Sequence, residues 1–431
     1  MQRIVWRWIA AASVLALAAS ANARPRYGGT LRVETQAAPE VLSPTDERLG
    51  PLVFDRLIVL DERNRVRPGL AVAWEHDAGY RRWELRLRAG VRFHDGTPLD
   101  ATAAGLSVGA RTAGDRLVFE RDRPSPDLLL ELAGPAGAVV RLTGEGALVG
   151  SGPFRIARWE AGKAAVLEAN AEHWAGRPFL EAIEAQMARP LRDQLVDLEL
   201  GKADVVELAP DEARRASQRG VRVWASRPMT LVALAVTVED TRVREALALA
   251  VDRGAIHSAV MQRWGEPAGG LLPNWLSGWA WLFPTGPDLE RARRDVAGAR
   301  PGPLVLAYDA ADPAARLVAE RVAVNAREAG LLVRPAAGAA HAEVRLMYRR
   351  IAPLGPARSL AQLATDLGLA AGNPATDEDA YQYERSQVGD FRVIPLVHLQ
   401  DVYGLSRRVQ DWSGRLWGNV WLEVSPDKGR P

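Results

Sequence analysis

The sequence has no cysteine among its 431 residues. This absence excludes disulfide bonds, thiolate metal sites and a cysteine nucleophile. It also excludes a lipoprotein, because the lipid of that class is attached to a cysteine. Only six histidines are present, and no two of them are spaced four residues apart in the zinc-binding pattern with a glutamate. The sequence therefore predicts neither a set of metal ligands nor a resident cofactor.

Long apolar runs are scarce, and the run at the N-terminus is typical of an export signal. Arg3 and Arg7 precede the run IAAASVLALAAS, and Ala21-Asn22-Ala23 provides the small residues of a cleavage site. The run is shorter than the roughly 20 apolar residues that span a bilayer, and an uncleaved anchor is the alternative. We expect a signal peptide over residues 1–23, a periplasmic location and no stable membrane insertion.

An excess of basic charge is also lacking once this segment is removed. The formal net charge is +2, and residues 1–23 carry two arginines and no acid, so the remainder has 2 − 2 = 0. The remainder contains no clustered basic stripe of the kind that nucleic-acid binding needs. We therefore expect no nucleic-acid partner.

The residues that are present describe a folded protein of more than one domain. Hydrophobic residues make up 48% and charged residues 25% of the chain, which is ordinary for globular proteins. At about 150 residues per domain, the length predicts roughly two to three domains. Tryptophan occurs 14 times, against 7 tyrosines and 7 phenylalanines. Its large apolar face and single N–H suit both cores and pocket walls.

Local patterns predict strands and helices along much of the chain. Trp83, Leu85 and Leu87 alternate with charged residues, which is typical of a half-buried strand. Asp100 is a suitable N-cap for a helix over the residues that follow. In the second half of the chain, predicted strands and amphipathic helices alternate. This alternation favours an α/β fold.

Two stretches have the residue types of a catalytic site. His94 and Asp95, in RFHDGTPLDA, resemble half of a catalytic triad, but Asp95-Gly96 followed by Thr97-Pro98 favours a turn between a strand and a helix. Gly105-Leu106-Ser107-Val108-Gly109 matches the nucleophile motif of serine hydrolases, which requires a strand-to-helix elbow. A secreted serine hydrolase that uses Ser107 is therefore the alternative to a binding function.

Six ordered blocks of the sequence resemble the family 5 bacterial extracellular solute-binding proteins, which serve importers of oligopeptides, dipeptides and nickel. The block LAVAWEHDAGYRRWELRLRAGVRFHDGTPLDA is the most specific of them. Together the blocks extend over most of the chain that follows the export signal. They lie at residues 27–34, 70–101, 150–187, 198–208, 240–256 and 393–406.

The resemblance implies an α/β, two-lobed periplasmic-binding-protein fold of the class II, cluster C type, with a hinge and a ligand cleft between the lobes. By position, lobe I comprises residues 24–232 plus 393–431, with a shortened subdomain near 105–150. Lobe II comprises residues 233–392. A ligand that prefers the closed form shifts the balance between open and closed states toward closure.

The function implied by the resemblance is that of a periplasmic substrate-binding component of an ABC-type importer, not an enzyme. The expected partners are a small solute or short peptide and the permease subunits of the transporter, and the protein is expected to be a monomer. A degenerate member that acts as a sensor or scaffold is a further alternative, motivated by the shortened subdomain.

The sequence departs from the family where peptide-binding members carry an aspartate for the peptide N-terminus. The corresponding stretch, VRLMYRRIAPLGPARS, has arginines and no acid. Paired arginines suit a carboxylate or phosphate in a bidentate fork. We expect the cleft to be lined by this stretch, by the end of the first strand and by a tryptophan-rich loop. The predicted ligand-binding residues are Glu34, Thr35, Trp275, Trp279, Trp281, Tyr348, Arg349 and Arg350.

Overall fold

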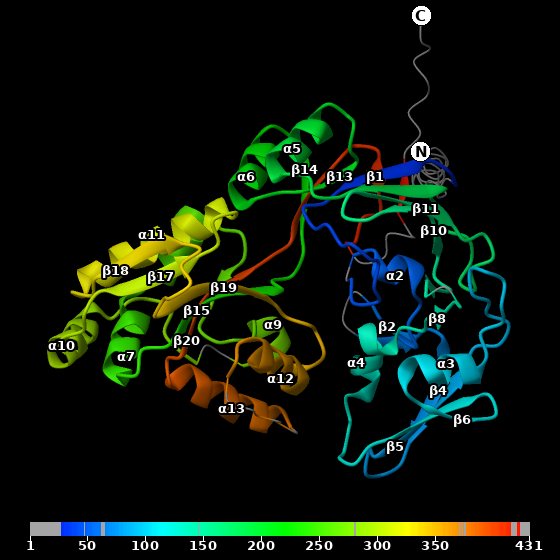
Figure 1. Cartoon of the computed structure of the whole chain (residues 1–431), viewed down its shortest axis with the longest axis horizontal. Coiled ribbons are helices and arrows are strands. Elements are labelled where there is room, and N and C mark those ends of the chain that lie inside the picture. Colours follow the sequence, from blue (N-terminus) through cyan, green and yellow to red (C-terminus); the bar gives the residue numbers. More distant parts are fainter. Residues whose placement is uncertain are drawn as a thin grey trace, which may run out of the picture.

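A computed structural model describes residues 27–422, except 47, 62–64, 145, 280–281, 370–371, 373, 375 and 415–419. Three bodies are visible in Figure 1: one at the upper right, a smaller one below it, and a third at the left. Each body is built on its own β-sheet and has its own hydrophobic core. No helix among these residues is long and apolar enough to cross a membrane.

The upper right body, which we call lobe I, contains a seven-stranded sheet in the order β10-β11-β12-β1-β13-β21-β14. β1 lies at its centre and pairs in parallel with β12 and β13, which places the buried side chains of Leu31 and Val33 in the core. The strands are β1 (Thr30–Glu34), β10 (Phe154–Glu160), β11 (Ala164–Ala169), β12 (Ala182–Gln186), β13 (Val205–Glu207), β14 (Arg222–Ala225) and β21 (Val402–Leu405). The helices α5 (Leu191–Glu199) and α6 (Pro210–Gln218) pack beside β13 and β21.

The smaller body, which we call the subdomain, contains a four-stranded antiparallel sheet in the order β4-β5-β7-β6. Its elements are β4 (Ala71–His76), β5 (Arg82–Leu87), α3 (Ala101–Val108), β6 (Arg111–Ala113), β7 (Arg116–Glu120) and α4 (Leu128–Leu132). Its core extends from Leu57 to Val139. The subdomain is therefore broader than the region 105–150 to which we assigned it.

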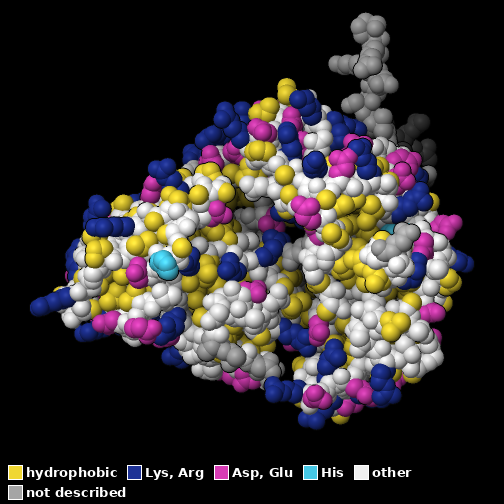
Figure 2. All heavy atoms as spheres, in the orientation of Figure 1, with side chains coloured by type: hydrophobic (Ala, Val, Ile, Leu, Met, Phe, Trp, Pro, Cys, Tyr) yellow, Lys and Arg dark blue, Asp and Glu magenta, His cyan; other side chains and the backbone are white. Residues whose placement is uncertain are grey.

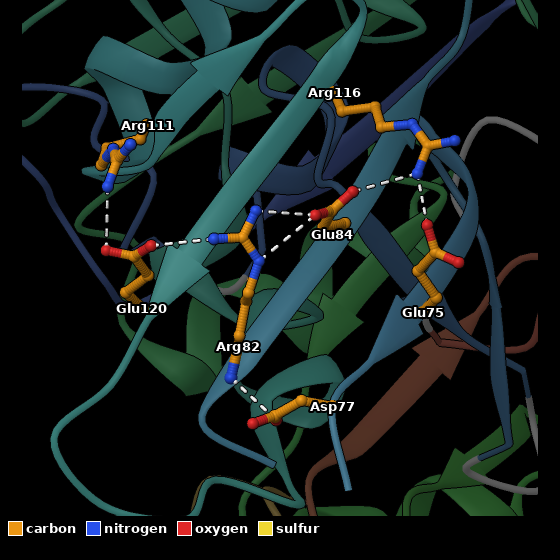
Figure 3. Close-up of polar contacts among 7 residues, drawn as sticks. All are labelled: Glu75, Asp77, Arg82, Glu84, Arg111, Arg116 and Glu120. Carbon is orange, nitrogen blue, oxygen red and sulfur yellow. Dashed lines mark hydrogen bonds and ion pairs between the residues drawn. The ribbon is translucent and has the colours of Figure 1, made fainter. Parts of the chain in front are cut away.

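The strand predicted over Arg82–Arg88 is present as β5, and its alternation builds the subdomain. Trp83 and Leu85 are buried, while Arg82 and Glu84 lie on the outer face. Glu84 accepts hydrogen bonds from Arg82 (2.8 Å) and Arg116 (3.0 Å), and these bonds lower its pKa. The ladder of ion pairs across this face, drawn in Figure 3, comprises Glu75, Arg82, Glu84, Arg111, Arg116 and Glu120. Asp77, also drawn there, accepts the backbone N–H of Arg82 (3.0 Å). Such exposed pairs contribute little stability each, but they keep the sheet face polar.

The left body, which we call lobe II, contains a six-stranded sheet in the order β16-β20-β15-β19-β17-β18. The strands are β15 (Thr230–Val236), β16 (Glu266–Pro267), β17 (Leu304–Tyr308), β18 (Val333–Ala337), β19 (Val344–Arg350) and β20 (Val393–Leu399). One face packs against α7 (Thr241–Ala250), α10 (Leu289–Ala299) and α11 (Pro313–Glu328). The other packs against α12 (Pro356–Asp366) and α13 (Asp377–Gly389), which lie below the sheet in Figure 1.

Strand pairing corrects the predicted limits of the lobes. We assigned residues from 393 onward to lobe I, but β20 pairs with β15 in the sheet of lobe II, with Thr230 opposite Leu399. The limit at 232/233 likewise falls inside β15. The chain therefore changes sheets at residues 226–229 and again at 400–401. These two crossing segments form the hinge.

Side-chain caps begin several helices, among them the helix predicted to start at Asp100. The Asp100 carboxylate accepts the N–H of Ala103 (2.8 Å) at the start of α3. Asp240 caps α7, and Asp252 caps the short helix α8 (Arg253–Ala255).

The remaining elements are short. They are α2 (Gly50–Val53), β2 (Ile58–Leu60), β3 (Val66–Pro68), β8 (Arg141–Leu142), β9 (Leu148–Val149), η1 (Pro135–Gly137), η2 (Ile256–Val260), α9 (Asn274–Ser277), β22 (Val409–Gln410) and β23 (Trp421–Leu422).

Candidate functional site

The stretch around His94 and Asp95 is a turn, as its sequence indicates. The Asp95 carboxylate accepts the N–H of Thr97 (3.0 Å), and Gly96 has a φ of +83°. The imidazole of His94 donates from Nε2 to the carbonyl of Gly152 (3.0 Å), and burial lowers its pKa. These groups are used to join the subdomain to lobe I. They do not form an acid–base pair.

Ser107 lacks the setting of a nucleophile. It lies inside α3, not on a strand-to-helix elbow. Its hydroxyl donates to the carbonyl of Ala138 (3.1 Å) and accepts the N–H of Val140 (2.8 Å). The hydroxyl therefore fastens a helix to a neighbouring loop. The serine hydrolase alternative required a strand-to-helix elbow at Ser107, and the structure has a helix there.

The molecule is hollowed at its centre, between lobe II on the left of Figure 2 and lobe I with the subdomain on the right. Charged residues from both sides meet at the hinge. Arg48 donates to the hydroxyl of Thr35 (2.7 Å) and pairs with Glu207 (2.5 Å). Arg350 at the end of β19 pairs with Asp401 in the second crossing segment (2.8 Å).

We call these residues, together with Tyr403, the hinge cluster. Electrostatic interactions of Arg48 with Glu207, Tyr403, Asp401 and Arg350 place the whole set close together. Tyr403 is buried there, and burial raises its pKa to about 12. Two arginines face two carboxylates, so the cluster has no net charge. Such a site suits a ligand that carries both a positive and a negative group.

Of the two residues predicted at the end of the first strand, only Thr35 belongs to this cluster. Glu34 is 5% exposed, and burial, followed by repulsion from Asp197, raises its pKa. Its partner is Arg189, at 3.6 Å between Oε2 and Nε. Successive residues of a strand point to opposite faces. Glu34 therefore points into lobe I and away from the groups that Thr35 contacts.

The tryptophans predicted to line the cleft brace a loop of lobe II. Trp275 on α9 donates from Nε1 to the carbonyl of Pro228 in the first crossing segment (2.9 Å). Trp279 donates to Glu384 on α13 (3.0 Å). Trp281 lies outside the described residues. Both described indoles have an internal hydrogen-bond acceptor, so their first role is to hold this loop against the hinge and α13.

The predicted pair Arg349 and Arg350 does not form a bidentate fork. Both residues lie in β19, where neighbouring side chains point to opposite faces of the sheet. Arg349 donates to the carbonyl of Asp366 (3.1 Å) at the C-terminus of α12, a favourable position for a cation. Arg350 turns the other way, to Asp401. The prediction that one ligand carboxylate spans both guanidinium groups is therefore wrong.

The edge of β19 is open where β17 ends. β17 pairs with β19 only at Val344 and Arg345, and β19 continues to Arg350. An open hollow of about 520 Å³ lies along this edge, lined by Tyr308, Asp309, Gly338, Ala339, Ala340 and residues 345–349, Tyr348 among them. Within the described part of the chain, no strand covers the edge from Leu346 to Arg350.

Backbone pairing shows which groups of β19 face the hollow. The N–H of Ile351 donates to Met229 (2.7 Å), and the N–H of Thr237 donates to Glu343 (2.9 Å). Because hydrogen-bonded pairs alternate in antiparallel strands, the odd-numbered residues of β19 bond to β15. The even-numbered residues therefore face the side of β17. The pairing of Ala307 with Arg345 uses the N–H of Leu346, and the carbonyl of Tyr348 accepts a hydrogen bond from Arg349 (2.9 Å). The C=O of Leu346 and the N–H of Tyr348 point to the open edge.

Two buried side chains, Glu384 and His398, bond to the segment 271–279 that carries the tryptophans, and neither of them was predicted from the sequence. Glu384 is fully buried and accepts the N–H groups of Leu271 (2.5 Å) and Leu272 (2.9 Å) as well as Trp279 Nε1. His398, 2% exposed, donates from Nε2 to the carbonyl of Leu271 (3.0 Å). Burial raises the pKa of Glu384 to about 7 and lowers that of His398 to about 4. No sequence motif signals either contact, since the partners are more than 100 residues apart.

The cleft is also bridged on the side away from the hinge. Arg358 on α12 of lobe II pairs with Glu131 on α4 of the subdomain, and Arg121 lies 3.8 Å from the same carboxylate. Leu354 lies beside Gly134, and Gly355 lies beside Leu130 of α4. We call the pair of Arg358 and Glu131 the latch. Among the residues described, no cluster of three or more His, Cys, Asp or Glu could hold a metal ion.

Comparison with known proteins supports this architecture. Residues 108–350 match the family model described as bacterial extracellular solute-binding proteins, family 5 Middle. Protein XP55 of Streptomyces lividans is 27% identical, over 62% of this chain and 58% of its own length. The oligopeptide-binding protein AppA of Bacillus subtilis is 22% identical, over 62% of this chain and 57% of its own. The matched region thus spans just over half the length of these relatives.

Solved structures resemble the chain over nearly its whole length. AppA of Bacillus subtilis in complex with a nonapeptide superposes with a TM-score of 0.75 at 16% identity, over 93% of this chain and all of that one. NikA of Staphylococcus aureus in complex with Ni(L-His)2 gives 0.77 at 15% identity, over 89% and 96%. These likenesses show the fold. Since the family match alone extends over more than half of the residues, the chain belongs to the family 5 bacterial extracellular solute-binding proteins.

Proposed function

We propose that the protein is the periplasmic substrate-binding component of an ABC-type importer, without catalytic activity of its own. It captures a short peptide between its two lobes and delivers it to permease subunits in the membrane. Family membership supports this function, as does the similarity to AppA of Bacillus subtilis, which is named an oligopeptide-binding protein. The hinge cluster contains two positive and two negative side chains and therefore has no net charge. It suits a zwitterionic ligand better than a ligand that carries only negative charge.

The observation that carries the proposal is the open edge of β19. Extended peptides bind to exposed sheet edges by adding a strand, since the edge supplies unpaired N–H and C=O groups in a regular row. The C=O of Leu346 and the N–H of Tyr348 supply such groups, and the hollow beside them is large enough for a short peptide. Main-chain recognition of this kind accepts many side chains and demands an extended backbone.

Closure of the lobes is the event by which the bound peptide is retained. The latch and the hinge cluster connect the lobes at opposite sides of the cleft. A peptide that contacts both lobes binds the closed form better than the open form, and this difference shifts the population. The closed form is then the one that the permease subunits recognise.

Tyr348→Pro is expected to weaken peptide binding by about tenfold, because proline removes the N–H that faces the open edge, and a net hydrogen bond to a peptide is worth about 1 kcal/mol or more. Proline is tolerated at a strand edge whose N–H has no partner strand. Isothermal titration of an equimolar pool of tripeptides into the purified protein measures the effect.

Tyr348→Ala is the matched control for this variant, because it removes the same side chain but keeps the N–H. Tyr348 packs on the core of lobe II, so both variants should unfold below the wild-type temperature, and at temperatures close to each other, in the absence of peptide. If the proline and alanine variants bind the pool equally well, the edge of β19 does not read the peptide backbone. If the wild-type protein binds no peptide at all, the proposed function is wrong.

A further inference from the structure

The latch lies apart from the hollow and from the hinge cluster. Arg358 on α12 donates to Glu131 on α4, and Arg121 of the subdomain lies 3.8 Å from the other oxygen of that carboxylate. The side chains of the latch are mostly buried, at 29% and 28% exposure. Arg121, Glu131 and Arg358 do not line the hollow along β19. The latch therefore joins lobe II to the subdomain without using a group that faces the hollow.

Backbone and apolar groups of the same two bodies meet beside the latch. Gly355 has a φ of +87°, a conformation that favours glycine, and a β-carbon placed on it would lie 3.3 Å from Cδ1 of Leu130. A β-carbon placed on Gly134 would lie 3.5 Å from Cδ2 of Leu354. The two glycines thus allow lobe II to approach α4 to van der Waals distance, where close contacts add to the attraction.

The segment of lobe II that makes these contacts is held in place by lobe II itself. The hydroxyl of Ser359, which is 1% exposed, donates to the carbonyl of Ala352 (2.5 Å) and accepts the N–H of Leu354 (3.0 Å). Pro356 begins α12, and its ring fixes φ. Because the segment is already ordered, little conformational entropy is lost when it docks on the subdomain.

Asp127 adds an electrostatic contact between the two bodies. Its Oδ2 lies 4.0 Å from the position of a β-carbon on Gly355, the N-cap residue of α12. The N-terminus of a helix favours a nearby acid. Burial raises the pKa of Asp127, the charge of Arg358 acts to lower it, and Asp377 on α13 acts to raise it. Arg358 is therefore attracted by two carboxylates of the subdomain, those of Asp127 and Glu131.

All these contacts require lobe II to lie against the subdomain. Figure 1 shows α4 and α12 at the lower side of the molecule, far from the crossing segments that form the hinge. A rotation that opens the cleft therefore breaks the contacts. An interaction that is present in one of two conformations shifts the population toward that conformation. The latch and its neighbours thus favour the closed form whether or not a ligand is bound.

We propose that the latch keeps the two lobes closed in most molecules that carry no ligand, so that a ligand enters only while Arg358 is released from Glu131. The inference rests on the proposed function only for the ligand that enters. Closure without a ligand is a property of the chain itself. The subdomain then has a second role beside its attachment to lobe I, because it is the surface on which lobe II docks.

The absence of cysteine allows spin labels to be attached at introduced positions alone. Leu106→Cys on α3 and Arg385→Cys on α13 place one label on an exposed residue of the subdomain and one on an exposed residue of lobe II. The labelled protein is unfolded in urea, dialysed and refolded, which removes any bound molecule. Double electron–electron resonance then measures the distances between the labels. With the latch intact, we expect one dominant short distance.

Arg358→Gln in the labelled protein should add a second, longer distance. The ratio of closed to open molecules should fall about fivefold, near the upper end for an ion pair of this exposure. Glu131→Gln should have an effect of similar size. The double variant should be about as open as either single variant, because both substitutions break the same pair.

Arg316→Gln is the matched control, because it breaks an exposed ion pair with Glu320 inside α11 and leaves the subdomain untouched. It should have the same distances as the labelled parent. A parent that is mainly open would overturn the inference, as would an Arg358→Gln variant that is as closed as the parent. Equal opening by Arg316→Gln would overturn it too. No ligand is present in these measurements, so their outcome is separate from the peptide titration that decides the proposed function.

Discussion

Glu384→Ala is expected to lower the free energy of unfolding by about 4 kcal/mol. The substitution leaves three buried donors without an acceptor, namely the N–H groups of Leu271 and Leu272 and the indole N–H of Trp279. Each unsatisfied buried group costs about 1–3 kcal/mol. Urea unfolding of the purified protein measures the change. We also expect weaker peptide binding, because the loop that these bonds hold also carries Trp275, which contacts the hinge.

Glu384→Gln is the matched variant, since its amide oxygen can still accept the two backbone N–H groups. It should lose only the bond to Trp279 and about 1 kcal/mol. If alanine and glutamine are equally destabilising, the hydrogen bonds of the carboxylate do not hold the loop. The loss would then come from packing alone.

The glutamine variant also changes how stability depends on pH. The pKa of folded Glu384 is raised from 4.5 to about 7, so its contribution is complete below pH 4.5 and is lost as the pH rises through 7. The pKa of folded His398 is lowered from 6.5 to about 4, so its contribution is complete above pH 6.5 and is lost as the pH falls through 4. The two contributions oppose each other between pH 4.5 and 6.5. In Glu384→Gln only the histidine remains, and stability should fall by about 3 kcal/mol from pH 7 to 4.

Arg253→Ala should cost about 3–5 kcal/mol of unfolding free energy. Arg253 is fully buried, and burial lowers its pKa to about 10. Its guanidinium donates to the carbonyls of Pro395 (2.7 Å), Ala248 (3.2 Å) and Val251 (3.3 Å), and it lies 5.0 Å from the ring centre of Phe283. It thereby joins the end of α7 to β20. Alanine leaves these carbonyls unpaired and also creates a cavity.

Arg253→Met separates the two causes, because methionine fills much of the space but donates no hydrogen bond. Replacing a buried charge with an apolar residue of similar volume is sometimes neutral. Because the three carbonyls would lose their donor, we expect the methionine variant to be less stable than the wild-type protein and more stable than the alanine variant. Thermal and urea unfolding of the three proteins give the order. A methionine variant as stable as the wild type would show that the guanidinium contributes no net stability.

Local features of the fold were predictable wherever a short pattern decides the structure. The alternation of Trp83, Leu85 and Leu87 identified β5, and Asp100 identified the start of α3. Gly162 lies in the turn between β10 and β11 with a φ of +65°, a conformation that favours glycine. These features depend on residues close together in sequence. In such a strand, helix start or turn, residues that are adjacent in the sequence determine the backbone conformation and the alternation of side chains.

Features that depend on pairing between distant segments were not predictable. The run VIPLVHL is apolar throughout, so nothing in it shows that β20 pairs with β15 and not with a strand of lobe I. Tyr348, Arg349 and Arg350 were grouped as ligand-binding residues because they stand where peptide-binding relatives carry an aspartate segment, yet a strand sends Arg349 and Arg350 to different faces. The open edge exists because β17 ends before β19, and only the register shows this. Glu384 has its partners more than 100 residues away.

The positions of the hinge and the latch determine which contact breaks first when the lobes move apart. The two crossing segments emerge side by side, because Thr230 is paired with Leu399 where they begin. Opening is then a rotation about one short axis, with lobe II as the lever arm. Figure 1 shows α4 and α12 at the lower side of the molecule, far from the crossing segments at the top. Displacement grows with distance from the axis, so a small rotation that barely moves Arg350 from Asp401 separates Arg358 from Glu131.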